Sequence, residues 1–300
     1  MESILITGGS GFIGSKLASQ LYKKHHVIII DRKEPSHDFY SEFYAADICD
    51  TEMLSSLQFK KAPSLIYHAA AQSGGYYSLK NPRDDFKWNA LGTFNLVEMA
   101  RVWEVEKIVY TSSMAVYGNM ENASETDLPD PISFYGASKL TGEHYIQLLG
   151  IHADINWTIL RLFATYGAGQ DLDNRHQGIL SIYLAQALES DTISITGAKD
   201  RVRELIHVDD VIKASEKALF EPITNGKIYN VSNGIPLSPE LIINEIARQM
   251  NKDLKINEID GYLGDQVLIT SDTTNIKTLV DDFRTLSDGV AEFLNGINHE

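Results

Sequence analysis

Tyr135 and Lys139 stand four residues apart, a spacing that could support acid–base chemistry. On a helix, two such side chains lie on the same face. A free phenol has a pKa near 10, so a general base that works near pH 7 needs a pKa lowered by about 3 units. A cation about 4 Å away stabilises a phenolate by roughly that amount at an effective dielectric constant near 20. The pair therefore predicts a tyrosine that accepts a proton.

The same spacing occurs again at Tyr76 and Lys80, so spacing alone is weak evidence. The sequence around each pair separates them. An Asn-Pro dipeptide directly follows Lys80 and predicts that no helix forms there, because proline disfavours helical backbone at the preceding residue. Residues 133–147 instead have the pattern of an amphipathic helix. The pair inside that helix is the better candidate.

Short apolar runs alternate with helical patterns along most of the chain. Runs of this kind, rich in branched residues, are typical of parallel strands buried on both faces. Their alternation with helices is typical of a doubly wound α/β fold. The predicted strands are 4–6, 27–30, 65–67, 108–110, 157–160 and 228–231, and the predicted helices are 13–24, 52–59, 83–101, 134–149, 178–190 and 209–220.

A glycine-rich turn, Thr7-Gly-Gly-Ser-Gly11-Phe-Ile-Gly14, follows the first predicted strand. Glycines let the backbone turn tightly and approach a pyrophosphate, which then meets the positive end of the next helix. The second predicted strand ends at Asp31, about 20 residues further on, where a carboxylate can accept hydrogen bonds from a ribose diol. This order predicts dinucleotide binding by Gly8, Gly11, Phe12, Ile13, Gly14 and Asp31.

The acid at the end of the second strand also bears on which dinucleotide binds. Asp31 would repel a 2′-phosphate, which favours NAD over NADP. Arg32 and Lys33 follow it and could attract that phosphate, or they could be solvated surface charges. NADP therefore stays possible.

The alternation of strands and helices loosens after Leu160. We predict a Rossmann domain that binds NAD, formed by residues 1–165 together with about 205–235. A smaller lobe that binds the substrate would be formed by 166–204 and 236–300. No linker-like segment separates the two parts, so we expect them to pack as one body.

Composition excludes several classes of protein. The chain has 26 basic and 41 acidic residues, and its net charge of −15 would repel nucleic acid and anionic membranes. Its one cysteine, Cys49, excludes a disulfide framework, and its nine histidines form no array with metal-ligand spacing, so we predict no metal. A strand pattern begins almost at Met1 and no long apolar run occurs, so we expect a cytoplasmic protein without signal peptide or membrane span.

The glycine turn, Asp31, Tyr135 and Lys139 together resemble the extended short-chain dehydrogenase/reductases, and within them the nucleotide-sugar epimerase/dehydratase group, such as UDP-glucose 4-epimerases. The resemblance covers nearly the whole chain. Further matching motifs, in the expected order, are Asp47-Ile48, His68-Ala-Ala-Ala71, Asn89 with Thr93, Thr111–Gly118, Arg161–Gly167, Arg203–Val211 and Tyr229–Gly234.

The resemblance implies a role for each reacting group. Tyr135 would take the proton from a sugar hydroxyl, Lys139 would lower the phenol pKa and hold the nicotinamide ribose, and Ser113 would orient the reacting oxygen. Arg203 would pair with the nucleotide diphosphate through its bidentate guanidinium. Further residues expected at the cofactor are Arg32, Asp47, Ile48, Ala69, Ala70, Ala71, Asn89 and Ser112, and further residues expected at the sugar nucleotide are Ala164 and, from its position alone, Tyr76.

Two residues before the Val-Tyr-Gly run help to choose the reaction. Dehydratases of this group commonly carry acids there to protonate the leaving hydroxyl, whereas this chain has Met114 and Ala115. Two reactions remain: 4-epimerisation through a transient 4-keto sugar with hydride return, and reduction of a 4-keto sugar with NAD(P)H. A redox-neutral epimerase suits NAD and is favoured, with the ketoreductase as the alternative. An NAD-binding scaffold without turnover is disfavoured, because both Tyr135 and Lys139 are present.

The resemblance also bears on substrate binding and assembly. Ala164 stands where many members of the group have an asparagine at the substrate phosphate, which leaves the substrate class open. Such proteins commonly dimerise through the helices equivalent to 83–101 and 134–149, which predicts a homodimer. The apolar side chains on the first of these helices could equally face the sheet: Phe86, Leu91, Phe94 and Val97.

Overall fold

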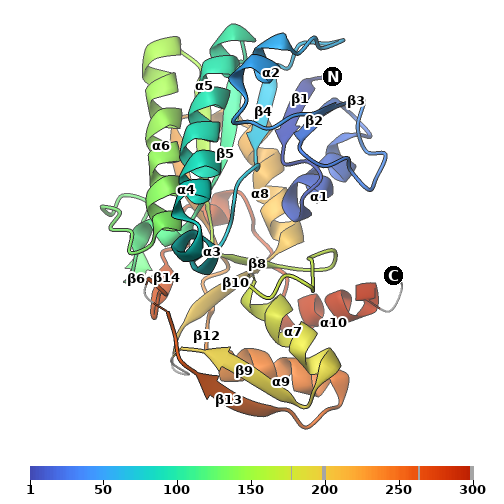
Figure 1. The fold of residues 1–300 in the computed structure, drawn as a ribbon, viewed down its shortest axis with the longest axis vertical. Helices are drawn as coiled ribbons and strands as arrows, with labels where there is room; N and C mark the ends of the chain where they lie inside the picture. The colour runs from blue at the N-terminus through green and yellow to red at the C-terminus, as the bar shows by residue number, and fades with distance from the viewer. Residues whose placement is uncertain (177, 198–200, 263, 298–300) are drawn as a thin grey trace.

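A computed structural model describes residues 1–176, 178–197, 201–262 and 264–297 (Figure 1). Within these ranges, seven parallel strands form one sheet in the order β11-β7-β5-β4-β1-β2-β3. The predicted doubly wound fold is confirmed, and all six predicted strands belong to this sheet. The strands are β1 Ser3–Thr7, β2 His26–Asp31, β3 Glu42–Ala45, β4 Leu65–His68, β5 Lys107–Ser113, β7 Asn156–Leu162 and β11 Lys227–Val231.

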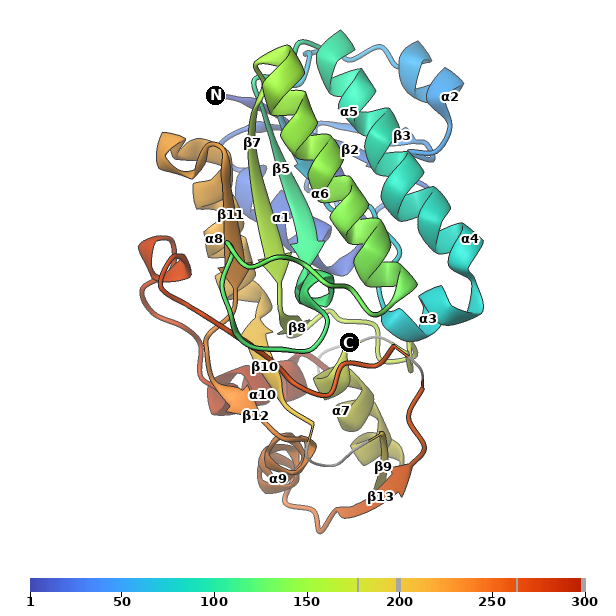
Figure 2. The same ribbon diagram turned by 90° about the vertical axis from the view of Figure 1, so that its left-hand side faces the viewer.

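Helices cover both faces of this sheet. The helices α1 (Phe12–Leu21) and α8 (Val208–Phe220) pack together on one face. On the other face, α5 (Gly92–Val102) and α6 (Phe134–Ala153) run side by side (Figure 2). Successive residues of β1 point to opposite faces, as the pleat requires, and supply the apolar clusters beneath both helix pairs.

The helix predicted over 83–101 has three parts. It begins as α4 (Pro82–Asp85), continues as a π-helix, η1 (Phe86–Leu91), and ends as α5. Short π-helical segments are rare and occur frequently at functional sites. The short α2 (Thr51–Ser56) lies near the predicted 52–59.

The prediction that Tyr76 and Lys80 lie outside a helix is wrong, because α3 spans Gly75–Lys80. Proline restricts the residue before it rather than the turn before that residue. Asn81 takes this restricted conformation, with φ of −132° and ψ of 61°, and the helix ends just before it. Both Tyr–Lys pairs are therefore helical.

A smaller part of the molecule, below the main sheet in Figure 1, has its own apolar cluster and paired strands. The sequence analysis did not predict its last two helices. The predicted division into 1–165 with about 205–235 and 166–204 with 236–300 stays a prediction. The strands here are β8 Ala164–Tyr166, β9 Thr192–Thr196, β10 Arg203–His207, β12 Pro236–Leu237 and β13 Lys255–Ile259, and the helices are α7 Ile179–Glu189, α9 Pro239–Met250 and α10 Leu286–Ile297.

The remaining elements of the described ranges are two short strands and three 3-10 helices. The strand β6 (Met120–Ala123) pairs with β14 (Ile269–Ser271), which brings the C-terminal part of the chain beside the end of the main sheet. The 3-10 helices are η2 Met114–Tyr117, η3 Pro222–Thr224 and η4 Ile276–Thr278. None of the helices in the described part of the chain is both long and apolar enough to traverse a lipid bilayer.

Candidate active site

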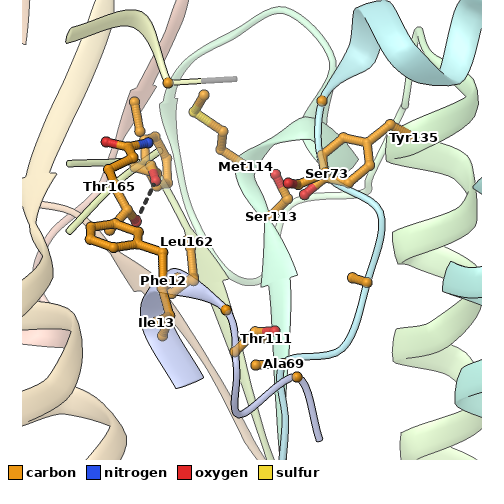
Figure 3. A pocket seen from close by; sticks show the side chains of 18 of the residues that line it. Phe12, Ile13, Ala69, Ser73, Thr111, Ser113, Met114, Tyr135, Leu162 and Thr165 are labelled. Carbon is orange, nitrogen blue, oxygen red and sulfur yellow. Dashed lines mark hydrogen bonds between the residues drawn. The ribbon is translucent and has the colours of Figure 1, made fainter. Parts of the chain in front are cut away.

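A cavity of about 520 Å³ lies where β1, β4 and β5 reach their carboxyl ends (Figure 3). Ligands of open α/β sheets commonly bind at this edge. Most of the predicted site residues line it: Gly8, Gly11, Phe12, Ile13, Gly14, Ala69, Ala71, Ser112, Ser113, Tyr135, Lys139, Ala164 and Arg203. The fold therefore brings together residues that are up to 195 positions apart in the sequence, from Gly8 to Arg203.

Three of the four glycines in the glycine turn have different roles. Gly8 has a φ of +73°, and a Cβ there would lie 2.7 Å from the backbone nitrogen of Ala70. A Cβ on Gly14 would overlap the carbonyl oxygen of Gly8, so the start of α1 packs directly on the turn. A Cβ on Gly11 would meet one neighbouring atom, at 3.3 Å, and would project beside the cavity. Gly11 also precedes α1 without a capping side chain, which leaves the first amides of that helix available to an anion.

Six predicted cofactor residues are not among those lining this cavity: Asp31, Arg32, Asp47, Ile48, Ala70 and Asn89. Asp31 ends β2, and its carboxylate accepts hydrogen bonds from the backbone amides of Ser10 and Lys33, each at 3.1 Å. Its orientation is therefore fixed by the glycine turn. The guanidinium of Arg32 lies 4.5 Å from the ring centroid of Trp88, stacked on an aromatic face. The cofactor-binding roles of these six residues stay predictions.

Tyr135 lies in the first turn of α6, which Ser133 caps by accepting a hydrogen bond from Gly136 at 3.1 Å. Its phenol faces Ser113 at the end of β5, with Ser73 beside them (Figure 3). Burial raises the pKa of Tyr135 to about 12, while the Ser113 hydroxyl lowers that pKa and Asp85 raises it further. In the protein alone, desolvation of the phenolate therefore has the largest effect on this pKa, and the role of Tyr135 as a base stays a prediction.

Lys139 is almost fully buried, with 2% of its surface exposed. Its Nζ lies 4.3 Å from the ring centroid of Tyr110. Burial lowers the pKa of Lys139 to about 7, against the opposing effects of Glu143 and Asp85. Small changes in nearby charge therefore decide whether this lysine is an ammonium at neutral pH.

A buried ion pair supports the back of the site. Glu143, one turn after Lys139, accepts hydrogen bonds from Arg161 at 3.0 and 2.7 Å and from the Ser112 hydroxyl at 2.5 Å. The sequence analysis gave Glu143 no role, nor did it name Ser73 or Asp85. The four-residue spacing from Lys139 was a signal that could have revealed Glu143.

A second compartment of about 810 Å³ lies between the main sheet and the smaller part of the molecule. It shares Ser113, Tyr135 and Arg203 with the first cavity. Tyr76, which was predicted from position alone, lines it. The Tyr76 ring stacks on His176 with 4.8 Å between centroids and meets the edge of Tyr262 at 5.4 Å.

Arg203 is the main cation between the two compartments. Its guanidinium donates to the carbonyl oxygen of Val202 at 2.8 Å and pairs with Asp265 at 3.3 Å. Burial and the nearby charge of Arg201 lower the pKa of Arg203 to about 10. Asp265 also pairs with Arg201, so one carboxylate lies between two guanidinium groups.

His207, Asp209 and Glu292 are the one described group whose ligand atoms lie close enough for a metal, within 4.8 Å of one another. Arg284 bonds Asp209 at 2.7 Å and Glu292 at 3.0 Å, so a guanidinium already stands where a cation would bind. The group is not assigned as a metal site, and the absence of a metal stays a prediction.

The model of the NAD dependent epimerase/dehydratase family matches residues 4–232. The chain belongs to this family. A putative UDP-glucose 4-epimerase from Methanocaldococcus jannaschii is 36% identical to this chain over 272 residues, which are 88% of this chain and 84% of the relative. The family resemblance stated from the sequence is confirmed.

Solved structures agree over the full length of this family member. The UDP-glucose 4-epimerase of Thermus thermophilus, in complex with NAD, has a TM-score of 0.90 and 27% identity and covers 99% of both chains. The UDP-glucuronic acid 4-epimerase of Bacillus cereus, in complex with UDP-glucuronic acid and NAD, has a TM-score of 0.87 and 27% identity, with coverage of 99% and 100%.

Proposed function

We propose that this protein is an NAD-dependent nucleotide-sugar 4-epimerase and that its substrates are UDP-sugars. The observation that carries the proposal is the meeting of two compartments, of about 520 and 810 Å³, at Tyr135 and Ser113. One compartment carries the glycine turn and the other carries the cations of the smaller part. The relatives named as UDP-sugar 4-epimerases, and the neighbours solved with NAD, support this assignment.

The residues present fit NAD as the resident cofactor. Gly11 leaves room for a pyrophosphate at the start of α1, and Asp31 offers carboxylate oxygens to a ribose diol. Lys139 and Tyr135 line the far end of the same cavity, where the nicotinamide ribose would lie. When bound, NAD would accept a hydride from the sugar carbon and give it back.

The protein itself moves one proton. Tyr135, as phenolate, would accept the proton of the sugar 4-hydroxyl and later return it to the same oxygen, while Ser113 donates a hydrogen bond to that oxygen. Burial makes the phenolate costly in the protein alone, so it needs the positive charge of Lys139. A keto sugar must present its opposite face for the configuration to invert, and the larger compartment offers the space for that turn.

The nucleotide diphosphate would bind in the larger compartment. Arg203 lies at the junction of the compartments, and α7 begins there at Ile179. Gly178 precedes that helix and has no side chain to cap it, so its first amides can donate to phosphate oxygens. Asp265 would have to give up its contact with Arg203 when the diphosphate binds.

Met114 and Ala115 argue against dehydration. Both line the larger compartment beside Ser113, where a dehydratase needs an acid to protonate the leaving hydroxyl. No observation favours a ketoreductase over an epimerase.

The test is an assay without added cofactor. The purified protein is incubated with UDP-, dTDP-, GDP- and CDP-sugars, and products are followed by NMR of the anomeric protons. We expect a mixture of 4-epimers from a UDP-sugar, and NAD released when the protein is denatured. If product forms only when NADPH is added, the protein is a reductase rather than an epimerase.

We also propose a homodimer formed through η1, α5 and α6. Phe86 is 61% exposed, Phe94 is 39% exposed and Leu148 on α6 is 45% exposed, whereas Val97 packs toward the sheet. The helices α5 and α6 run side by side (Figure 2), and the ring centroid of Phe94 on α5 lies 5.2 Å from that of Tyr145 on α6. Sedimentation should give a dimer that Phe94→Glu dissociates and Leu188→Glu, at a similarly exposed position on α7, does not. A monomeric wild-type protein would contradict the proposal.

A further inference from the structure

Asp85 is a buried carboxylate that the proposed reaction leaves without a role. It ends α4 directly before the π-helix, and 1% of its surface is exposed. Its Oδ1 accepts a hydrogen bond from Asn89 Nδ2 at 3.1 Å. Its Oδ2 is buried and has no hydrogen-bond partner within the described ranges. Such a carboxylate is costly unless a nearby positive charge offsets it.

Asn89 holds Asp85 against the catalytic face of α6. The backbone amide of Gln72 donates to Asn89 Oδ1 at 2.8 Å, which fixes the orientation of the side-chain amide. Asn89 Nδ2 then donates both to Asp85 and, at 3.1 Å, to the hydroxyl of Ser138. Ser138 lies between the two proposed catalytic residues of α6 and donates to the carbonyl oxygen of Tyr135 at 3.0 Å. The carboxylate is thereby tied to the turn of helix that carries Tyr135 and Lys139.

The groups that face Lys139 come from four elements. They are Glu143 on α6, Tyr110 on β5, His68 on β4 and Asp85 on α4. Burial raises the pKa of the Tyr110 phenol, and it lowers the pKa of His68 to about 3, so both are neutral near pH 7.

The two carboxylates beside Lys139 differ in what neutralises them. Glu143 is bound by the guanidinium of Arg161. Asp85, on α4, is the carboxylate whose charge is not already paired with an arginine. Both carboxylates favour the ammonium form of Lys139, Glu143 more strongly than Asp85, and the charge of Asp85 adds to that of Glu143.

We propose that Asp85 is a positioning residue that keeps Lys139 protonated while Tyr135 exchanges the sugar proton. This inference rests on the roles proposed above for Tyr135 and Lys139. Burial raises the pKa of Asp85 to about 6, and burial lowers that of Lys139 to about 7. Each charge stabilises the other in the pH range where the protein would work.

The proposal predicts an unusual change in the pH profile. Without the carboxylate, Lys139 should lose its proton at lower pH. The alkaline limb of the kcat profile should therefore move to lower pH. Removal of the carboxylate also removes a negative charge that raises the pKa of Tyr135, so the acidic limb should move to lower pH as well. A residue that only supports the fold would lower kcat without moving either limb.

The first test compares Asp85→Asn with the wild-type protein that carries its own cofactor. Asparagine keeps the shape and the acceptor for Asn89 and removes the charge. We expect both limbs of the kcat profile to move to lower pH by about one unit. Asp84→Asn, at the adjacent and less buried carboxylate, should leave both limbs in place. Limbs that stay in place in Asp85→Asn would overturn the proposal.

The second test needs no activity. Thermal unfolding at pH 6.5, where both Asp85 and Lys139 are mostly charged, is measured for Asp85→Asn, Lys139→Met and the double variant. If the two charges interact, the change in Tm of the double variant should differ from the sum of the single changes by at least about 2 °C. Additive changes would overturn the link between the two residues. A wild-type protein that epimerises no sugar would refute the proposed function, yet this cycle would still decide whether Asp85 acts on Lys139.

Discussion

Two regions of this molecule carry the same pair of residues at the same spacing, and they differ in almost everything else. Tyr135 and Lys139 lie on α6, and Tyr76 and Lys80 lie on α3. Lys139 is 2% exposed, and burial lowers its pKa to about 7. Lys80 is exposed, and its ammonium lies 5.5 Å from the ring centroid of Tyr76. The difference teaches that burial and neighbouring carboxylates, rather than spacing, prepare a lysine to control a phenol.

The two helices explain why burial differs. The helix α6 has 20 residues and packs along β5, with Ser138, Lys139 and Glu143 on its buried face. The helix α3 has six residues and only Ser78 is buried. A helix that short depends on its neighbours for stability and has little surface with which to enclose a side chain. Only the long helix can hold a lysine away from water.

The largest expected effect comes from removing the phenol of the enclosed pair. Tyr135→Phe should lower kcat by about 10³-fold, because a general base typically contributes 10²- to 10⁴-fold. Dinucleotide released on denaturation should be unchanged, since the glycine turn is intact. In Tyr76→Phe the ring still stacks on His176, so kcat should stay within about threefold while KM changes modestly. A Tyr135→Phe variant with near wild-type kcat would remove the distinction between the two pairs.

The second largest effect on kcat should distinguish the lysines of the two pairs. Lys139→Met removes the cation that stabilises the phenolate, and we expect kcat near pH 7 to fall by about 10²-fold. Methionine has a similar length, so the packing against Tyr110 is kept. Lys80→Met removes an exposed charge and should change kcat by less than about twofold. Steady-state kinetics with a UDP-sugar measures both, and equal losses in the two variants would show that burial is not what matters.

The parts of the fold that could be predicted are those with strong local patterns. The runs at 4–6, 27–30 and 108–110 are apolar on both faces, and each is a central strand. The edge strand β3, Glu42–Ala45, was missed because it is short and half exposed, so its sequence has no such run. The helices α9 and α10 were also missed, although Ser238 caps α9 and Pro239 stands at its start, both of which are sequence signals of a helix start.

Prediction of the site succeeded where glycine or a motif fixes the backbone, as at Gly8, Gly11 and Gly14. It failed where tertiary packing decides the chemistry. The buried face of α6 is polar at Lys139 and Glu143, which a search for apolar periodicity does not detect. Asp85 is tied to α6 through Asn89, which lies in the π-helix between α4 and α5, and that segment has no recognisable sequence pattern.

The smallest effect, and the one that isolates burial from catalysis, is on stability. The pKa of Lys139 is lowered in the folded protein from its ordinary value near 10.4, so the unfolded chain binds more protons between about pH 7 and 10. Stability should therefore rise with pH in this window, at most by about 1.4 kcal/mol per pH unit. Lys139→Met should remove this rise, whereas Lys80→Met should keep it. Urea unfolding at pH 7.5 and 9 measures the difference, and parallel behaviour of the two variants would mean that Lys139 is not desolvated in the folded protein.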